Sequence, residues 1–403
     1  MADVPREIDS FAAHPEREVQ EQRRPNMVRQ TRLPADPESW LVREAPDAPV
    51  LFFRPDVLQA TARRFLAGFP GLVTYAVKAN PDPAVLANLA AAGIGAFDVA
   101  SPEEMALARA AAPDAVLHYH NPVRSAAEIA AGRAAGVASW SVDRLSELDK
   151  LACLAPRTEI AVRLKLPVPG AAYDFGSKFG AAPEEAAALL RAVVARGFTP
   201  SVTFHPGTQC TDPAAWARYI AASAEAATAA GVRLARLNVG GGFAADRSGA
   251  APDLEAVFAV IGAATREAFG ANAPALVCEP GRAMVAEAVT LALRVKASDD
   301  RAVTLNDGIY GALAEWRDMG PGGRLRVLSP AGHLRSAAPR PRLAFGPTCD
   351  SLDRLPDPID LPGDIAEGDW LICPAMGAYS GALVTRFNGY GAREVVTLGP
   401  AAA

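Results

Sequence analysis

The stretch LVTYAVKAN at residues 72–80 places a single lysine directly after a short apolar run. Residues 72–77 are aliphatic, β-branched or aromatic, a composition that predicts a buried strand with Lys78 at its carboxyl end. A lysine at the edge of a core either extends its ammonium into water or forms a covalent bond, for example a Schiff base with a carbonyl cofactor. Taken alone, the stretch favours the first of these two roles.

Strands and helices alternate after this stretch, and this alternation predicts the fold class. We expect strands at 72–78, 96–101, 115–121, 138–143, 159–165, 199–205, 235–240 and 275–280, and alanine-rich helices at 83–92, 102–112, 126–135, 144–155, 184–196, 213–230 and 253–269. Such units form a parallel sheet, and eight of them in this length predict a closed (β/α)8 barrel. Short β-like runs follow from about residue 284. The expected architecture is an α/β fold with a TIM-like (β/α)8 barrel and a mainly β C-terminal domain.

The segment before the barrel has two parts. Residues 1 to about 30 are polar and lack a hydrophobic period, which is typical of a mobile arm or of an extension around a partner subunit. PVLFFRP (49–55) predicts a short strand, and 55–69 a helix. Because 403 residues exceed what one core supports, we expect an N-terminal arm at 1–45 that partly joins the β domain, a barrel at 46–283 and a β domain at 284–403.

Composition excludes several classes of function. The net charge of −5 argues against nucleic-acid binding, which needs clustered basic residues. The five cysteines show no CxxC pairing, which fits a reducing compartment and gives no structural zinc site. No apolar run is long enough to span a membrane. We therefore expect a soluble, cytoplasmic protein without nucleic-acid or membrane partners.

Polar residues gather at the carboxyl ends of the predicted strands, where barrels carry their chemistry. The set is Lys78, Asp98, Asn121, Arg163, His205, Gly240–Gly242, Glu279 and Arg282. The glycine run exposes successive backbone N–H groups that suit a phosphate, and Arg282 adds a cation. Glu279 follows four apolar or soft residues. It would hold a proton on a heteroaromatic ring nitrogen, or pair with an arginine such as Arg163.

Three histidines near these strand ends need an explanation. His205 either packs in the core or stacks on a cofactor ring. A phosphate site, a ring partner at Glu279, a stacking His205 and a Schiff-base Lys78 together indicate pyridoxal phosphate, whose protonated ring accepts electrons. His118 and His120 lie on one face of a strand, but no third ligand is evident, so we predict no metal.

Nine motifs, in order along the chain, resemble those of the fold-type III pyridoxal-phosphate decarboxylases. They are TYAVKAN (74–80), FDVAS (97–101), SKFG (177–180), TFHPGTQC (203–210), NVGGGF (238–243), CEPGR (278–282), NDGIYG (306–311), GPTCDSLDRL (346–355) and GDWLICPAMGAYSGALVTRFNGYG (368–391). The resemblance covers nearly everything from residue 50 onward. The chain is similar to the ornithine, diaminopimelate and arginine decarboxylase family, which implies an alanine racemase-like fold.

The resemblance implies a cofactor site residue by residue. Lys78 would bind pyridoxal 5'-phosphate covalently, Glu279 would pair with the ring nitrogen, and His205 would stack on the ring. The phosphate would be held by Thr208, Gly240, Gly241, Gly242, Gly281, Arg282 and Tyr379. Asp98 and Arg163 would support the cofactor and its lysine.

The same resemblance implies a homodimer with shared active sites. The GPTCD string would reach the partner's site, where Cys349 delivers the proton that replaces carbon dioxide and Asp350 binds the distal ammonium of the substrate. Asp318 would be a second carboxylate for that ammonium, and Phe387 would be a wall of the pocket.

The implied activity is decarboxylation of L-ornithine to putrescine in polyamine biosynthesis, with L-lysine to cadaverine as a second reaction. Arg317 stands where relatives place an aromatic residue, and it either neutralises Asp318 or points into solvent; we favour solvent. Lys178 and Asp353 match a pair that bridges the subunits in relatives. The alternatives are a decarboxylase of another basic or diamino acid, such as diaminopimelate, and an inactive regulatory paralogue. CDSLD (349–353) disfavours the first, and the intact catalytic residues disfavour the second.

Overall fold

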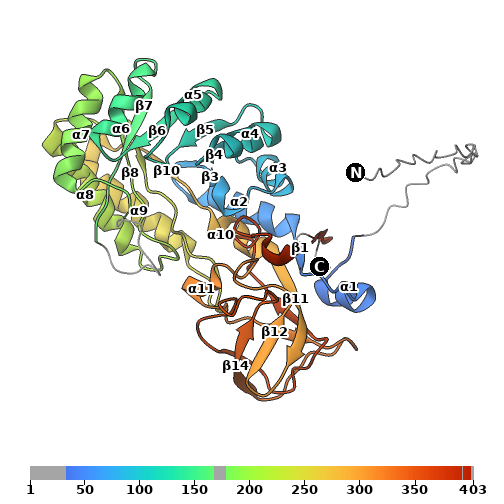
Figure 1. Ribbon diagram of the computed structural model, residues 1–403. Coiled ribbons are helices and arrows are strands. Elements are labelled where there is room, and N and C mark those ends of the chain that lie inside the picture. The colour runs from blue at the N-terminus through green and yellow to red at the C-terminus, as the bar shows by residue number, and fades with distance from the viewer. Residues whose placement is uncertain (1–32, 168–177, 393, 401–403) are drawn as a thin grey trace, which may run out of the picture. The chain divides into compact units, whose positions relative to one another are not determined.

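Parallel strands surrounded by helices form the larger part of the protein (Figure 1). The computed structural model describes residues 33–167, 178–392 and 394–400. The parallel sheet contains β2 (Leu72–Val73), β3 (Tyr75–Ala76), β4 (Ala96–Asp98), β5 (Val116–Tyr119), β6 (Ser139–Val142), β7 (Glu159–Arg163), β8 (Thr199–Thr203), β9 (Arg236–Asn238) and β10 (Ala275–Cys278). Each expected strand is present within a few residues. The expected arm lies outside the described residues as far as residue 32.

The first strand closes the barrel by dividing at Thr74. Its first half, β2, pairs with β10, and its second half, β3, pairs with β4, so that the sheet runs back onto its own beginning. The backbone N–H of Thr74 and its hydroxyl both donate to the carbonyl of Cys278, at 2.9 and 3.0 Å. The two halves are one interrupted strand, so the predicted (β/α)8 barrel is confirmed.

Helices follow the strands as the sequence predicts. They are α2 (Pro55–Gly68), α3 (Pro83–Ala91), α4 (Pro102–Ala111), α5 (Ala126–Ala134), α6 (Leu145–Lys150), α7 (Pro183–Ala195), α8 (Ala214–Ala230) and α9 (Leu254–Phe269). Side chains of Asp82, Ser101, Ser125 and Asp253 cap α3, α4, α5 and α9 by accepting a backbone N–H of the first turn. Trp140, Trp216, Phe97 and Phe204 are fully buried in the core. Among the described residues, no helix has the length and apolar character needed to cross a membrane.

A second, mixed sheet contains β1 (Val50–Phe53), β11 (Val289–Ser298), β12 (Ala302–Leu305), β13 (Arg326–Leu328), β14 (Pro339–Phe345), β15 (Ile359–Pro362), β16 (Trp370–Cys373) and β17 (Glu394–Thr397). Strand β1 falls in the segment expected to belong to the barrel. It pairs instead with β11 and β17, and all four of its residues are buried. The local pattern VLFF predicts a buried strand correctly but carries no information about its neighbours in the sheet.

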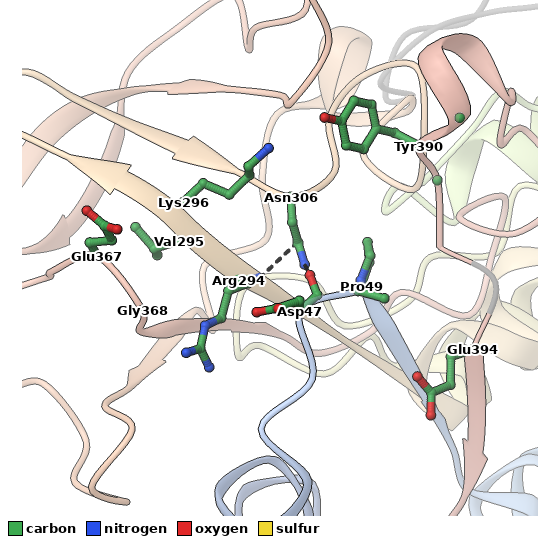
Figure 2. Close-up of a pocket in the computed structure, with 13 residues that line it drawn as sticks. Asp47, Pro49, Arg294, Val295, Lys296, Asn306, Glu367, Gly368, Tyr390 and Glu394 are labelled. Carbon is green, nitrogen blue, oxygen red and sulfur yellow. Dashed lines mark hydrogen bonds between the residues drawn. The ribbon is translucent and has the colours of Figure 1, made fainter.

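The first described helix, α1 (Pro37–Glu44), also contacts this sheet. Leu41 is fully buried in a cluster with Phe52 and Trp370, and Glu38 forms an ion pair with Arg326. A cavity of about 730 Å³ lies beside the same sheet (Figure 2). Arg294, Lys296, Asn306 and Tyr390 are among its lining residues, and none of the residues expected at the active site lines it.

Candidate active site

Lys78 lies in a single 3-10 turn (Val77–Ala79) directly after β3, at the carboxyl end of the interrupted strand. The expected strand therefore ends at Ala76, two residues earlier than predicted. Lys78 lines a cavity together with Ala76, His205, Thr208, Gln209, Gly241, Gly242, Phe243, Glu279, Gly281, Arg282 and Tyr379. Nine of the twelve residues expected at the cofactor line this one cavity. The other three, Asp98, Arg163 and Gly240, lie at the ends of β4, β7 and β9.

The glycine run at the edge of the cavity has a backbone that only glycine can form. Gly240 and Gly242 have φ values of +69° and +83°. A Cβ on Gly240 would lie 2.0 Å from the carbonyl oxygen of Phe204, and one on Gly242 would lie 2.4 Å from that of Gly207. Glycine alone meets both demands. The phosphate-binding role of the run stays a prediction, and its exposed backbone N–H groups would suit that role.

Arg282 also lines this cavity. It opens the short helix α10 (Arg282–Val285), and its Nη1 donates to Glu315 Oε2 at 2.6 Å while Nη2 donates to the second oxygen. Its guanidinium carbon lies 5.0 Å from the ring centre of Tyr379. Tyr379 adopts a φ of +64°, and its backbone N–H donates to Ala79 O at 2.7 Å. The C-terminal part of the chain thus encloses this side of the cavity. Glu315, just before α11 (Trp316–Met319), is a residue that the sequence did not indicate.

Glu279 is fixed by two neighbours. Its Oε1 bonds to Nδ1 of His120 and accepts from Nδ2 of Asn238, whose own Oδ1 accepts the Gly240 N–H at 2.9 Å. Burial raises the pKa of Glu279, but His120, Lys78 and Asn238 together outweigh burial and lower it to about 2. Glu279 is therefore an anion at the cavity. Its hydrogen-bonding partner is His120 rather than Arg163.

Asp98 lies beside this anion. Its Oδ1 is buried without a hydrogen-bond partner, and burial, then the charge of Glu279, raise its pKa to about 7. Ligand atoms of Asp98, His120 and Glu279 lie within 4.8 Å of one another, a spacing that also suits a metal ion. Because Glu279 Oε1 and His120 Nδ1 already bond to each other, the absence of a metal stays our prediction.

At neutral pH the ring of His205 is uncharged, whereas Lys78 is a cation. His205 Nδ1 accepts the Gly207 N–H at 3.1 Å, so its proton resides on Nε2. Burial, then the charges of Lys78 and Arg163, lower its pKa to about 3 and keep the ring neutral. Burial lowers the pKa of Lys78, but Tyr379, Asp98 and Glu279 outweigh it and raise the pKa above its usual value.

The residues expected at the substrate form a second cluster. Asn388 Oδ1 accepts from the backbone N–H and from Sγ of Cys349, at 3.2 and 3.4 Å. Asp350 Oδ2 accepts the Tyr310 hydroxyl at 2.6 Å, and Oδ1 accepts the Leu352 N–H at 2.9 Å. The rings of Tyr310 and Phe387 lie 5.2 Å apart. Tyr310 and Asn388 are thus positioning residues that the sequence did not single out.

This second cluster faces solvent in the single chain. Cys349 is exposed, and the exposed fraction of Phe387 is 44%. Asp318 lies on α11 and pairs with Arg317 at 3.1 Å, with both side chains more than half exposed. None of the four expected substrate and proton-donor residues is among the described residues that line the Lys78 cavity. Arg317 therefore points into solvent and pairs with Asp318 there.

The contacts that Asp353 makes within its own chain oppose the expected bridge to Lys178. Asp353 is 1% exposed, and its carboxylate accepts the N–H groups of Ile309 and Thr348 at 3.0 and 3.2 Å. Gly308 and Gly346 enclose it so closely that a Cβ on either would lie 2.2 Å from its oxygens. The carboxylate stabilises its own loop through these hydrogen bonds. In the single chain it is therefore not available to a partner's lysine.

The cavity fits pyridoxal phosphate on three observations of its residues. A lysine opens into it, a glycine run with an adjacent arginine suits a phosphate, and an ionised carboxylate stands where a ring nitrogen would need a charge partner. The buried, unpartnered Asp98 Oδ1 is a further polar atom that a bound group would satisfy.

Comparisons with known proteins agree with this fit. A family model described as the pyridoxal binding domain of pyridoxal-dependent decarboxylases matches residues 56–286. The chloroplastic ornithine decarboxylase of Nicotiana glauca is 34% identical over 345 residues, which are 80% of this chain and 77% of the relative. The lysine/ornithine decarboxylase of Selenomonas ruminantium is 32% identical over 334 residues, 79% of this chain and 81% of the relative. A solved lysine/ornithine decarboxylase from Vibrio vulnificus, complexed with putrescine, superposes with a TM-score of 0.76 at 27% identity, covering 90% of this chain and 97% of that one.

Proposed function

The chain belongs to the pyridoxal-dependent decarboxylases and acts on a basic amino acid; we propose that it converts L-ornithine to putrescine. L-Lysine to cadaverine is the second proposed reaction, because relatives named for both substrates align over most of the chain. The observation that carries the choice of a diamino acid is Asp350. Its carboxylate is held by Tyr310 and Leu352 next to the thiol of Cys349, so that a negative charge and a proton donor lie together. Polyamine biosynthesis is the corresponding proposed role.

The cofactor residues have distinct proposed roles. Bound pyridoxal phosphate would supply a protonated ring that accepts the electron pair released when carbon dioxide leaves. Lys78 would hold the cofactor covalently, and the ionised Glu279 would keep a proton on the ring nitrogen. Arg282 and the glycine run would hold the phosphate, with Thr208, Gly281 and Tyr379 beside them. The neutral His205 would stack on the ring without adding positive charge.

The substrate residues complete the site from a second copy of the chain. Since Cys349 and Asp350 face solvent rather than the cavity of their own chain, we propose a homodimer in which they serve the partner's Lys78. Asp350 of the partner subunit would bind the distal ammonium of the substrate. Cys349 of the partner subunit would then deliver a proton from Sγ to the α-carbon. Asp318 and Phe387 would line the same end of the pocket.

Selectivity for a cationic side chain would follow if the partner subunit buries that pocket end. A carboxylate that loses water on binding must find a cation, so a neutral amino acid of similar length leaves it unpaired at a cost of about 2 kcal/mol or more. In the unbound chain, Asp318 already has a cationic partner in Arg317. We therefore propose that Asp350 dominates the recognition. We also propose a cytoplasmic location, which the five unpaired cysteines support.

A carbon dioxide release assay with ornithine, lysine, arginine and diaminopimelate tests the proposal. We expect ornithine to give the highest kcat/KM and lysine the next. Asp350→Asn should lower kcat/KM for ornithine about 30-fold or more, because it removes one partner of a charge pair. Asp357→Asn, an exposed carboxylate in the same region, is the matched control. A preference for diaminopimelate would support the alternative decarboxylase, and a protein that binds the cofactor but releases no carbon dioxide from all four would support the regulatory paralogue.

A further inference from the structure

A chain of polar contacts runs from the cofactor cavity into the interior of the barrel. It begins at Glu279 Oε1, which bonds to His120 Nδ1. The other ring nitrogen of His120, Nε2, lies 3.0 Å from Ser139 Oγ, and that hydroxyl donates to Glu159 Oε1 at 3.1 Å. Glu159 Oε2 in turn pairs with Nε of Arg236 at 3.3 Å. His120 and Ser139 are buried, so bulk water does not compete for these contacts.

The directions of these hydrogen bonds decide the protonation of His120. A carboxylate can only accept, so Nδ1 must carry a proton to bond to Glu279. Asn238 Nδ2 also lies 3.0 Å from Nδ1, but it directs its proton to the same Glu279 oxygen, so Nδ1 remains a donor. Ser139 has one hydroxyl proton, and it is donated to Glu159, so the oxygen of Ser139 accepts from Nε2. Both ring nitrogens of His120 are therefore donors. The geometry describes an imidazolium held between a carboxylate on one side and a serine–carboxylate pair on the other.

The charges around His120 come from every neighbouring strand. Burial lowers the pKa of His120, but Glu279 after β10, Asp98 at the end of β4 and Glu159 on β7 together outweigh burial and raise it. Arg236 on β9 faces His118 rather than His120, at 3.4 Å from Nε2 of His118. On the same strand as His120, His118 lies 5.3 Å away ring to ring, and burial and then His120 lower its pKa to about 3. Of the two histidines, His120 is thus the one that carries charge.

We propose that His120 is a positioning residue that holds Glu279 as an oriented carboxylate for the cofactor ring, with its own second proton held by Ser139 and Glu159. The proposal rests on the proposed role of Glu279. It gives a function to His120, one of two histidines for which the sequence pattern suggested only metal binding. Asn238 completes the arrangement, because its Nδ2 donates to the same Glu279 oxygen while its Oδ1 is fixed by the Gly240 N–H. One oxygen of Glu279 is thereby immobilised on two donors, and the carboxylate can present its other oxygen to the cavity.

The first test measures the protonation of His120 in the wild-type protein with its cofactor bound. The chain contains five histidines, so ¹⁵N-histidine labelling gives a spectrum that can be assigned, with His120→Gln identifying the signal. We expect the imidazolium signature from both ring nitrogens of His120 at pH 7, and neutral rings for His118 and His205. A singly protonated His120 at pH 7 would overturn the proposal.

The second test separates the contact chain from general packing. Ser139→Ala removes the oxygen that accepts from Nε2, so the pH at which His120 loses its second proton should fall by about one unit. The pH midpoint of the visible absorbance band of the bound cofactor should shift in the same direction. Ser201→Ala is the control, since Ser201 is an equally buried serine on β8 whose oxygen accepts the Arg236 N–H. It should leave both midpoints unchanged.

The outcomes distinguish this inference from the proposed function. Midpoints in Ser139→Ala equal to those of the wild type would overturn the positioning role of His120. Cofactor binding with a neutral His120 would leave the decarboxylase proposal intact. A protein that fails to bind pyridoxal phosphate at all would refute the proposed cofactor role of Glu279, whatever the protonation state of His120.

Discussion

Asp98 shows how one residue is kept in an unusual charge state by its position at a strand end. Its pKa of about 7 lies well above the ordinary value of 3.8, first because it is buried and then because Glu279 is an anion beside it. Between about pH 4 and pH 7 the native carboxyl keeps a proton that the unfolded chain has lost. The free energy of unfolding therefore falls as the pH rises across this window.

Asp98→Asn should remove that pH dependence. An amide does not titrate, so we expect the melting temperature of the cofactor-free variant to fall less than that of the wild type between pH 4.5 and pH 7. Differential scanning fluorimetry across this range measures it. Glu279 does not contribute to the slope between pH 4.5 and pH 7. Its pKa is lowered to about 2, so its contribution to the free energy of unfolding is lost only below about pH 4.5. An identical slope in both proteins would contradict the assigned charge state.

Gly242 and Gly231 allow backbone strain to be separated from close approach. Both have positive φ, but a Cβ on Gly242 would lie 2.4 Å from Gly207 O, whereas one on Gly231 would meet no atom within 4 Å. Gly231→Ala should cost about 1 to 2 kcal/mol from conformation alone. Gly242→Ala should cost more and also weaken the binding of pyridoxal phosphate, measured by absorbance titration. Equal stability losses and unchanged cofactor affinity would mean that the glycine run is not needed for close approach.

Short helix α11 and the turn before it connect Arg282, at the Lys78 cavity, with Asp318, one of the residues expected at the substrate. Glu315 binds Arg282 with both oxygens, and three residues later Asp318 reaches solvent beside Arg317. The side chains of Arg282 and Glu315 are only 9% and 16% exposed, so the loss of one partner leaves a poorly hydrated charge. The element therefore holds the arginine that is expected to bind the cofactor phosphate.

Glu315→Gln should destabilise the cofactor-free protein by about 2 kcal/mol, because Arg282 loses its counter-charge. Pyridoxal phosphate should restore most of the loss, since its phosphate supplies a new counter-charge. Melting temperatures with and without the cofactor measure both effects. Glu44→Gln, which removes the acid of the exposed pair with Arg43, should change neither temperature. A loss that persists unchanged with bound cofactor would show that Glu315 acts on packing alone.

At the level of elements, periodicity predicted almost every strand and helix of the barrel, because each carries its own period and its own end signals. The interruption at Thr74 was not predictable, since VTYAV reads as one continuous strand. It arises from pairing with β10, about 200 residues away along the chain. The sequence also placed most cofactor residues in one cavity, because strand ends of a barrel must converge. It missed the pairing of His120 with Glu279 and of Glu315 with Arg282, since a contact across the fold depends on register and not on local pattern.

On the scale of the whole molecule, the residues expected at the active site lie in two separate places on the chain. Lys78 lines a cavity, whereas Cys349 and Asp350 lie in a separate, solvent-facing cluster. The sequence indicated both groups of residues but could not show that one chain keeps them apart. In the proposed homodimer a second copy supplies the missing cluster, which would make activity a property of the pair.

Mixing two inactive variants tests this division. Lys78→Ala and Cys349→Ala subunits, each inactive alone, should regain about a quarter of wild-type activity after subunit exchange. Half of the dimers are then mixed, and each mixed dimer contains one intact site of two. Sedimentation with differently labelled subunits verifies the exchange. No recovery despite verified exchange would place the whole site within one chain.

The position of β1 has a further consequence for how the chain is made. Residues 50–53 leave the ribosome long before both of their sheet neighbours, β11 at 289–298 and β17 at 394–397. At about 5 to 20 residues per second, the interval between β1 and β17 is roughly 15 to 70 s. Until β11 is made, roughly 12 to 50 s after β1, the four apolar residues VLFF have no native strand partner, and the barrel is synthesised between them and β11. The growing polypeptide therefore exposes four apolar residues while the barrel is being made, so we expect chaperones to bind residues 50–53 during synthesis.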